Sequence, residues 1–438
     1  MSSTLEQSAA LERSAMLKVA WRLVPFLGLA YFVNALDRTN VAMAALTMNK
    51  SLGFSAAEYG FGAGAFFWSY VLFQVPSNLM LARIGARRWL TVVIFAWGLA
   101  SASTALITDV TSFAVVRFLL GVAEAGYFPG VIFFMTRWFP SRHRGRAMGI
   151  FFAFSAVAVS TASPISGNIL ALHGWLGLAG WQWIFLIEAV PALILAVICP
   201  FLLRDTPQKA AWLTGDEKAW LAHQLATEQS QAHAAQASML RTLRDGRMIV
   251  MIVSYFGIGC GIYANIFFLP LIIKDLGFSN LTVSYMAALP AALGAVGMVV
   301  NSRHSDRTGE RMLHTALPML LAALGLLFTG ATVGNAWLEM IGLCVAGVGM
   351  SSCLPTFWTL PTTYLGVSAA AAGIALINSL GNISGYVAPQ VVGVLRDWTG
   401  NYSAPMYVAG GAVIVASALL PFCGVGTAPA RLSRAPVR

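Results

Sequence analysis

Residues 111–136 read TSFAVVRFLLGVAEAGYFPGVIFFMT, an apolar run in which only Arg117 and Glu124 carry a charge. A helix rises about 1.5 Å per residue, so this run can cross a hydrocarbon core about 30 Å thick. Similar runs fill almost the whole chain, which is 58% apolar and only 10% charged. A soluble protein carries about 25% charged residues to cover its water-facing surface, so this composition excludes a soluble protein. Runs of this length also exclude a membrane barrel, whose strands alternate and span about 9–11 residues.

The runs predict an all-α membrane protein with twelve transmembrane helices. Lys and Arg gather in alternate loops, and the positive-inside rule then places both termini in the cytoplasm. The expected spans lie at about 22–44, 58–82, 88–107, 111–136, 146–171, 181–203, 248–273, 280–302, 312–331, 335–358, 365–395 and 403–424. Because the basic residues lie in short loops, the net charge of +10 indicates membrane topology and not nucleic-acid binding.

An internal repeat divides these spans into two pseudo-repeats of six helices. One loop contains Arg83, Gly85 and Arg87, and a second loop contains Asp306, Arg307, Gly309 and Arg311 at an offset near half the chain length. Two such halves around a central cavity are typical of secondary transporters. The expected domains are a cytoplasmic N-terminus, two six-helix bundles joined by a cytoplasmic linker, and a cytoplasmic tail, at residues 1–21, 22–203, 204–247, 248–424 and 425–438. Within the linker, Asp216 to His233 is a candidate surface helix.

Four charged residues stand out well inside the expected spans, where a charge is costly and usually marks a pathway. Asp37 and Arg38 lie in the first span, and Arg117 and Glu124 lie in the fourth. At 1.5 Å per residue, Asp37 and Arg117 reach a similar depth in the outer half, and Glu124 lies deeper. Arg117 and Glu124 are two turns apart on one helix face, whereas the adjacent Asp37 and Arg38 point about 100° apart.

These four residues have two readings. They are either a structural network that locks the two spans together, or a site for anion binding and proton coupling. A lock needs one acid and one base, but this set offers two acids at different depths, which favours proton coupling. Arg binds a carboxylate through two parallel hydrogen bonds, so the arginines are candidate anion ligands. The five single cysteines show no metal-ligand spacing, and no cofactor, metal or nucleophile–base set is expected.

Several motifs resemble those of the major facilitator superfamily, and within it the anion:cation symporter family of organic-acid transporters. They cover nearly the whole chain and lie at 36–40 (LDRTN), 75–78 (VPSN), 117–130 (RFLLGVAEAGYFPG), 138–140 (WFP), 305–311 (SDRTGER) and 377–382 (INSLGN). The resemblance implies a monomeric carrier in the bacterial inner membrane, not an enzyme, that imports a small organic anion with protons by rocking of its halves. It also implies that Asp37 and Glu124 are linked to protons.

The same resemblance implies that Arg117 holds the substrate carboxylate. The neighbours that it implies are Arg38, Tyr70, Trp358 and Asn378. Phe357 and Trp358 favour an aromatic or heteroaromatic acid.

Two positions depart from the family pattern. Gln74 stands where many relatives carry Glu, so a third membrane acid is missing. Ala82 stands where the loop motif usually has Asp, so a weaker latch is expected in the N-terminal half. Sodium-coupled or exchange transport of an anion is the first alternative function. The second is a membrane receptor that binds an organic acid without moving it.

Overall fold

The computed structural model describes residues 2–233 and 246–423, and every regular element in these ranges is a helix. Ten helical stretches of this part of the chain are long and apolar enough to cross a membrane. The expected spans 58–82 and 365–395 are helical over most of their length but are not among the ten. The number twelve therefore stays a prediction.

The helices before residue 203 pack as a first group. They are α1 (Ser2–Leu52), α2 (Ala56–Ile84), α3 (Ala86–Ser103), α4 (Val110–Glu124), α5 (Tyr127–Thr136), α6 (Ser141–Leu170) and α7 (Gly180–Leu202). Within the group, α1 packs on α6 and α7, α2 on α4, and α3 on α7. Helix α1 runs without a break through the expected N-terminal tail and the first span, from Ser2 to Leu52.

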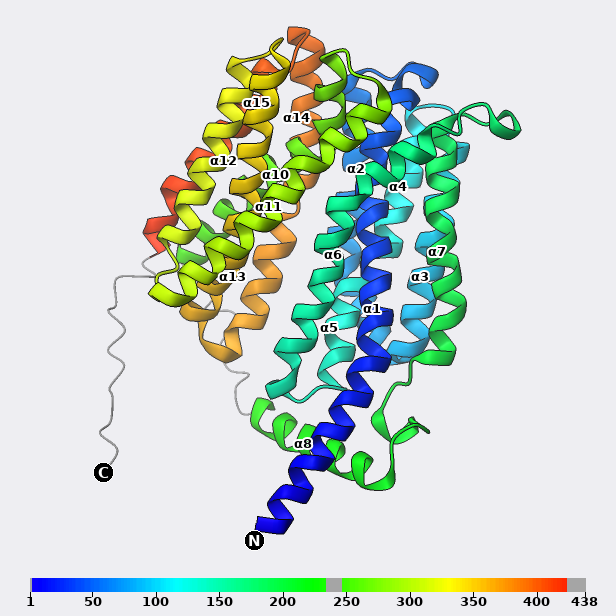
Figure 1. Ribbon diagram of the computed structural model, residues 1–438, viewed down its shortest axis with the longest axis vertical. Coiled ribbons are helices and arrows are strands. Elements are labelled where there is room, and N and C mark those ends of the chain that lie inside the picture. Colours follow the sequence, from blue (N-terminus) through cyan, green and yellow to red (C-terminus); the bar gives the residue numbers. More distant parts are fainter. Residues whose placement is uncertain (1, 234–245, 424–438) are drawn as a thin grey trace.

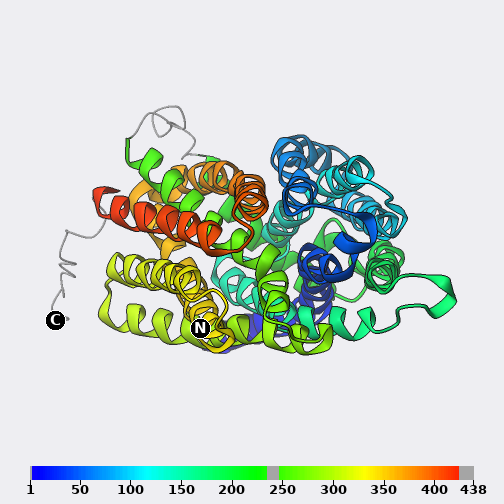
Figure 2. The ribbon, with the colours of Figure 1, turned by 90° about the horizontal axis from the view of Figure 1, so that it is seen from above.

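The helices after residue 246 pack as a second group. They are α10 (Gly246–Asp275), α11 (Asn280–Thr308), α12 (Leu313–Ala331), α13 (Ala336–Gly381), α14 (Ser384–Thr399) and α15 (Ser403–Leu419). Here α10, α11 and α12 pack on α13, and α12 and α10 pack on α15. The two groups lie side by side in both views of the molecule (Figures 1 and 2).

Helix α8 (Gly215–His233) matches the surface helix expected in the linker. It lies across one end of the first group, beside the start of α1 (Figure 1), and we call this the α8 end of the molecule. Two ion pairs attach it there. Glu217 on α8 bonds Lys18 on α1 at 2.7 Å, and Glu228 bonds Arg144 on α6 at 3.2 Å.

Two expected spans are interrupted. The run 111–136 divides into α4 and α5 at Ala125–Gly126, because Pro129 has no amide hydrogen to bond the carbonyl four residues earlier. The run 365–395 breaks at Asn382–Ile383, between two glycines that touch aromatic rings. Gly381 faces the ring of Tyr255, and Gly385 faces the ring of Phe67.

The two groups contact each other at the end opposite α8. The Asp397 carboxylate on α14 accepts hydrogen bonds from the amides of Ala56 and Ala57 at the start of α2, at 3.0 and 2.8 Å. Gly60 packs against the backbone of Pro389 with no room for a methyl group. In Figure 1 the ribbons of the groups converge at this end and diverge toward α8.

Candidate functional site

The four charged residues of the spans lie on two helices of the first group, α1 and α4. Asp37, Arg117 and Glu124 are buried, with at most 1% of each residue exposed. Arg38 differs, because 31% of its side chain is accessible. Of the four, Arg38 is therefore the residue that a solute can reach.

Arg38 and Glu124 form the ion pair of this site. The Nε of Arg38 donates to Oε2 of Glu124 at 2.9 Å, which joins α1 to α4. The second oxygen of Glu124 is buried and has no hydrogen-bond partner among the described residues. A buried carboxylate with one free oxygen can accept a proton or a further donor.

Asp37 points away from Arg38, as its adjacent position on α1 predicts. Its Oδ1 accepts a hydrogen bond from the hydroxyl of Ser101 on α3 at 2.7 Å and a longer one from Asn40 at 3.3 Å. Its Oδ2 is buried and without a partner in the described part of the chain. The two acids therefore sit in different surroundings, one against a cation and one against neutral donors.

Arg117 is a buried cation whose Nε and Nη2 have no hydrogen-bond partner within the described ranges. Its guanidinium lies 5.1 Å from the ring centroid of Phe66. The same ring lies 5.4 Å from the guanidinium of Arg38, so Phe66 contacts both arginines. A buried guanidinium that lacks its hydrogen bonds is costly, and an incoming anion would relieve that cost.

Tyr70 on α2, one of the predicted site residues, is adjacent to Arg38. The Arg38 guanidinium lies 4.7 Å from the Tyr70 ring centroid, and the ring stacks on Phe66 at 5.5 Å. These contacts fix the plane of the guanidinium.

Trp358 and Asn378, the two predicted site residues on α13, belong to the second group. Trp358 is partly buried and packs against Tyr255 at 4.8 Å between ring centroids. Asn378 is also partly buried. The contacts described for these two residues lie within the second group, and none joins them to Arg38.

Two tyrosines on α10 were missed from the sequence. Tyr255 and Tyr263 are eight residues apart, so they share a face of α10. Tyr263 packs on Phe67 of α2 at 4.5 Å and donates a hydrogen bond to Asn382 at 2.9 Å. Phe67 in turn touches Phe66, so aromatic contacts connect Arg38 to the second group. The spacing of the two tyrosines was the available signal.

Gln74, the position where the resemblance implies an acid, links the two groups. Its side-chain oxygen accepts a hydrogen bond from Ser379 on α13 at 2.9 Å. A further buried acid, Glu188 on α7, accepts a hydrogen bond from Ser166 on α6 at 2.7 Å. In the described part of the chain, no group of three or more His, Cys, Asp or Glu side chains is arranged to hold a metal ion.

The repeated loop motif forms two turns at the α8 end. Gly309 ends α11 with a positive φ of 70°, and Arg311 bonds Asp306 at 2.7 Å. In the first copy Gly85 has φ 91°, and Asp205 from the segment after α7 accepts a hydrogen bond from the Arg87 amide at 2.9 Å. Asp205 thus places a carboxylate at this turn, although Ala82 stands where the resemblance implies an Asp in the loop motif.

Two packed helix groups, with charged residues held between the membrane-length helices of the first, are typical of membrane carriers. A family model described as Major Facilitator Superfamily matches residues 27–389, and the chain belongs to this family. It is therefore a transporter and not an enzyme. It is a multi-pass integral membrane protein, and its bacterial relatives indicate the inner membrane.

Three relatives and two solved structures illustrate the match. A protein of Agrobacterium vitis, provisionally named a tartrate transporter, is 46% identical over 96% of each chain. The quinolone resistance transporter of Acinetobacter baumannii is 38% identical over 90% of this chain and 92% of its own. The inner membrane transport protein RhmT of Escherichia coli is 38% identical over 87% and 89% of the two chains.

The solved structures support the fold alone. A bacterial homologue of the human lysosomal transporter Spinster superposes with a TM-score of 0.76 at 16% identity, covering 92% of this chain and 96% of its own. A D-xylose–proton symporter gives 0.74 at 15% identity, covering 91% and 97%.

Proposed function

We propose that the protein imports a small organic anion together with protons. The observation that carries this proposal is the Arg38–Glu124 ion pair, in which the arginine is partly accessible and the acid is buried. A substrate carboxylate that reaches Arg38 competes with Glu124 for the same guanidinium. Protonation of Glu124 removes that competition, so proton uptake and anion binding favour each other.

The accessibility of Arg38 suggests a division of work between the two arginines. Arg38 makes the first contact with the substrate carboxylate, and Tyr70 holds the guanidinium plane toward it. Arg117 is fully buried, yet two of its nitrogens lack hydrogen-bond partners among the described residues, so it is a second anion ligand that is reached only after local rearrangement. The resemblance, by contrast, implies that Arg117 holds the substrate carboxylate and that Arg38 is a neighbour.

Charge balance suggests the stoichiometry. Asp37 and Glu124 offset Arg38 and Arg117, so the site is neutral when all four are charged. An uncompensated charge in a low-dielectric interior costs several kcal/mol. A monocarboxylate therefore brings one proton, and a dicarboxylate brings two, one on each acid.

We propose a small dicarboxylate such as tartrate as the substrate class. Two observations support this choice. Two arginines contact the Phe66 ring, and the 46% identical relative is named a tartrate transporter. The aromatic acid suggested by Phe357 and Trp358 is less favoured, because these two rings already pack on Tyr255.

The transport cycle proposed is alternating access by two six-helix bundles. This proposal includes twelve spans, cytoplasmic termini, and domain boundaries at 22–203 and 248–424. Contacts at the end opposite α8, with diverging helices at the α8 end, fit a carrier that is closed on the outer side (Figure 1). By this scheme the α8 end is cytoplasmic.

Uptake of labelled tartrate into proteoliposomes tests the proposal. Uptake should rise with an inward proton gradient. Glu124→Gln should abolish that response while tartrate exchange across the membrane continues, because exchange needs no net proton movement. Glu188→Gln is the matched control, since it removes a buried acid that bonds Ser166 and not an arginine.

Other outcomes would support the alternatives. Uptake that follows a sodium gradient and ignores the proton gradient would refute proton coupling and favour the sodium-coupled carrier. Binding without exchange or uptake would favour the receptor. Uptake of an aromatic acid with no response to tartrate would refute the substrate class but leave the coupling intact.

A further inference from the structure

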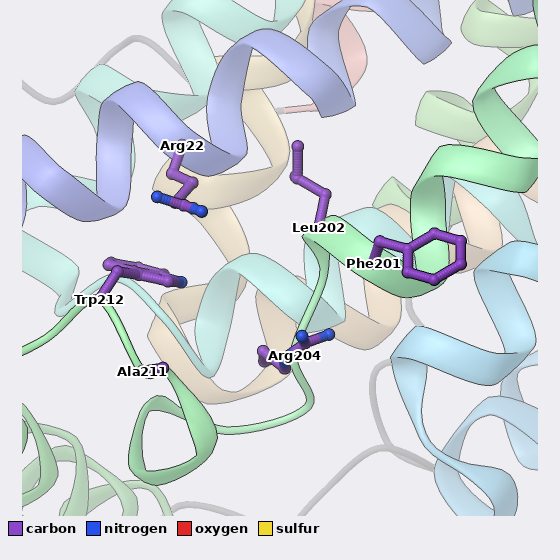
Figure 3. A pocket seen from close by; sticks show the side chains of 6 residues that line it. All are labelled: Arg22, Phe201, Leu202, Arg204, Ala211 and Trp212. Carbon is purple, nitrogen blue, oxygen red and sulfur yellow. The ribbon is translucent and has the colours of Figure 1, made fainter.

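A basic and aromatic hollow lies at the α8 end, outside the candidate transport site. Its first part has a volume of about 380 Å³ and is lined by Lys18, Trp21, Arg22 and Trp212. An adjoining part of about 300 Å³ is lined by Arg22, Phe201, Leu202, Arg204, Ala211 and Trp212. We call the two parts together the Arg22–Arg204 hollow. It is formed by α1, the end of α7 and the segment before α8 (Figure 3).

The charges of the hollow are unequal. Arg22 lies over the Trp212 ring at 5.5 Å and has no ion-pair partner among the described residues (Figure 3). Arg204 donates to the carbonyls of Pro200 and Leu203, both at 3.0 Å, which leaves donor capacity on its guanidinium. Lys18 is paired with Glu217. Two arginines of the lining therefore have no carboxylate partner in the described structure.

The surroundings place this hollow at the edge of a membrane. Trp21 on α1 is 76% exposed and Phe201 in the last turn of α7 is 74% exposed, and both helices are long and apolar enough to cross a bilayer. Exposed aromatic rings at the ends of spans lie at the level of lipid headgroups. Arginines beside such rings attract anionic headgroups, because their charge is complementary to the phosphate.

The floor of the hollow is rigid. Trp212 stacks on Trp138 at 5.5 Å between ring centroids with an interplanar angle of 15°. The indole N–H of Trp138 in turn donates to the Arg204 carbonyl at 3.1 Å. This connected set holds Arg22 and Arg204 at the same opening before any ligand arrives, which lowers the entropic cost of binding.

From these observations we propose that the Arg22–Arg204 hollow binds the phosphate headgroup of an anionic phospholipid. The phosphate lies between Arg22 and Arg204, and the acyl chains run along the exposed faces of Trp21 and Phe201. The lipid then joins α1 to the segment that leads into α8. This site is independent of the transport site, so the proposal does not rest on the substrate or the coupling ion.

Native mass spectrometry of the purified full chain tests this, with phosphatidylglycerol, phosphatidylethanolamine and inorganic phosphate as separate probes. Phosphatidylglycerol should bind, phosphatidylethanolamine should bind at least tenfold more weakly, and inorganic phosphate should not compete at equal concentration. The double variant Arg22→Gln, Arg204→Gln should weaken phosphatidylglycerol binding by about 30-fold, as expected for two surface cations. The Arg→Lys double variant should recover most of the binding, because it keeps the charge.

The control is Arg88→Gln with Arg303→Gln, which removes two exposed arginines outside the hollow. If lipid binding weakens equally in the control and the test variant, the proposal is overturned, because the effect then comes from the net charge of the protein and not from the hollow. Equal binding of phosphatidylethanolamine, or full competition by inorganic phosphate, would overturn it as well. An unchanged gel-filtration profile establishes that the glutamine variant is folded, so loss of binding in it supports the site.

Discussion

Asp397→Ala should open the molecule at the end opposite α8. The Asp397 carboxylate on α14 accepts two hydrogen bonds from the first amides of α2, at 3.0 Å from Ala56 and 2.8 Å from Ala57. These amides have no partner inside their own helix, and the helix dipole favours a negative charge beside them. The carboxylate therefore stabilises the arrangement in which the two groups touch.

The size of the effect follows from those contacts. A hydrogen bond to a charged group contributes about 1.5–3 kcal/mol when shielded from water. Asp397 and both amides are exposed, and water replaces the lost acceptor, so we expect about 1.5 kcal/mol for the pair together. This corresponds to a roughly tenfold shift in the ratio of closed to open molecules at this end.

Spin labels on the two groups measure the shift. Cysteines at Lys50 and Val333, both exposed at this end, carry the labels in a background without the native cysteines. Electron double resonance should show a longer-distance population that grows in Asp397→Ala. The control is Asp109→Ala, because Asp109 caps α4 through the Ser112 amide at 2.8 Å inside the first group. Identical distance distributions in wild type and Asp397→Ala would refute the reasoning, and so would an equal shift in the control.

Two further predictions concern other parts of the structure. Burial alone would raise the pKa of Glu217, but hydrogen bonds from Lys18, the Thr214 amide and Ser14 lower it from 4.5 to about 2. The contribution of Glu217 to the attachment of α8 should therefore be complete above pH 4.5 and be lost as the pH falls toward 2. This part of the change in α8 hydrogen exchange should be present in wild type and absent in Glu217→Gln. Gly121→Ala should destabilise the first group by about 1–3 kcal/mol, because the added methyl meets the α2 backbone, whereas Gly411→Ala has open space; equal thermal unfolding temperatures for the two variants would contradict this.

The membrane class and most helix positions were predictable because both depend on local composition. A long apolar run is a membrane helix in almost any fold, since unsatisfied backbone groups are too costly in lipid. The surface helix at Gly215–His233 was also predictable from its polar composition. The interruptions at Ala125–Gly126 and Asn382–Ile383 were not predicted, although Pro129 was visible in the first of them.

The candidate site was only partly predictable. The four charged residues were identified because charges inside apolar runs are conspicuous. Tyr70, named from the resemblance, lies against Arg38. The contacts of Tyr255 and Tyr263 could not be predicted from the sequence, because tyrosines are common in membrane helices and their spacing does not indicate what they face. Nor could the sequence show that Asp205 would occupy the turn at Gly85, since these residues are far apart in the chain.

By itself, the sequence determined that this protein crosses a membrane many times and that Asp37, Arg38, Arg117 and Glu124 are inside its spans. Only the tertiary structure decided that Arg38 pairs with Glu124 and that Asp37 turns to Ser101. It also decided that two nitrogens of Arg117 find no hydrogen-bond partner in the part of the chain that is described. Helical periodicity gives the depth and direction of each side chain on its own helix. The partner depends on how neighbouring helices are rotated and how closely they approach, and that is set by packing across the whole bundle.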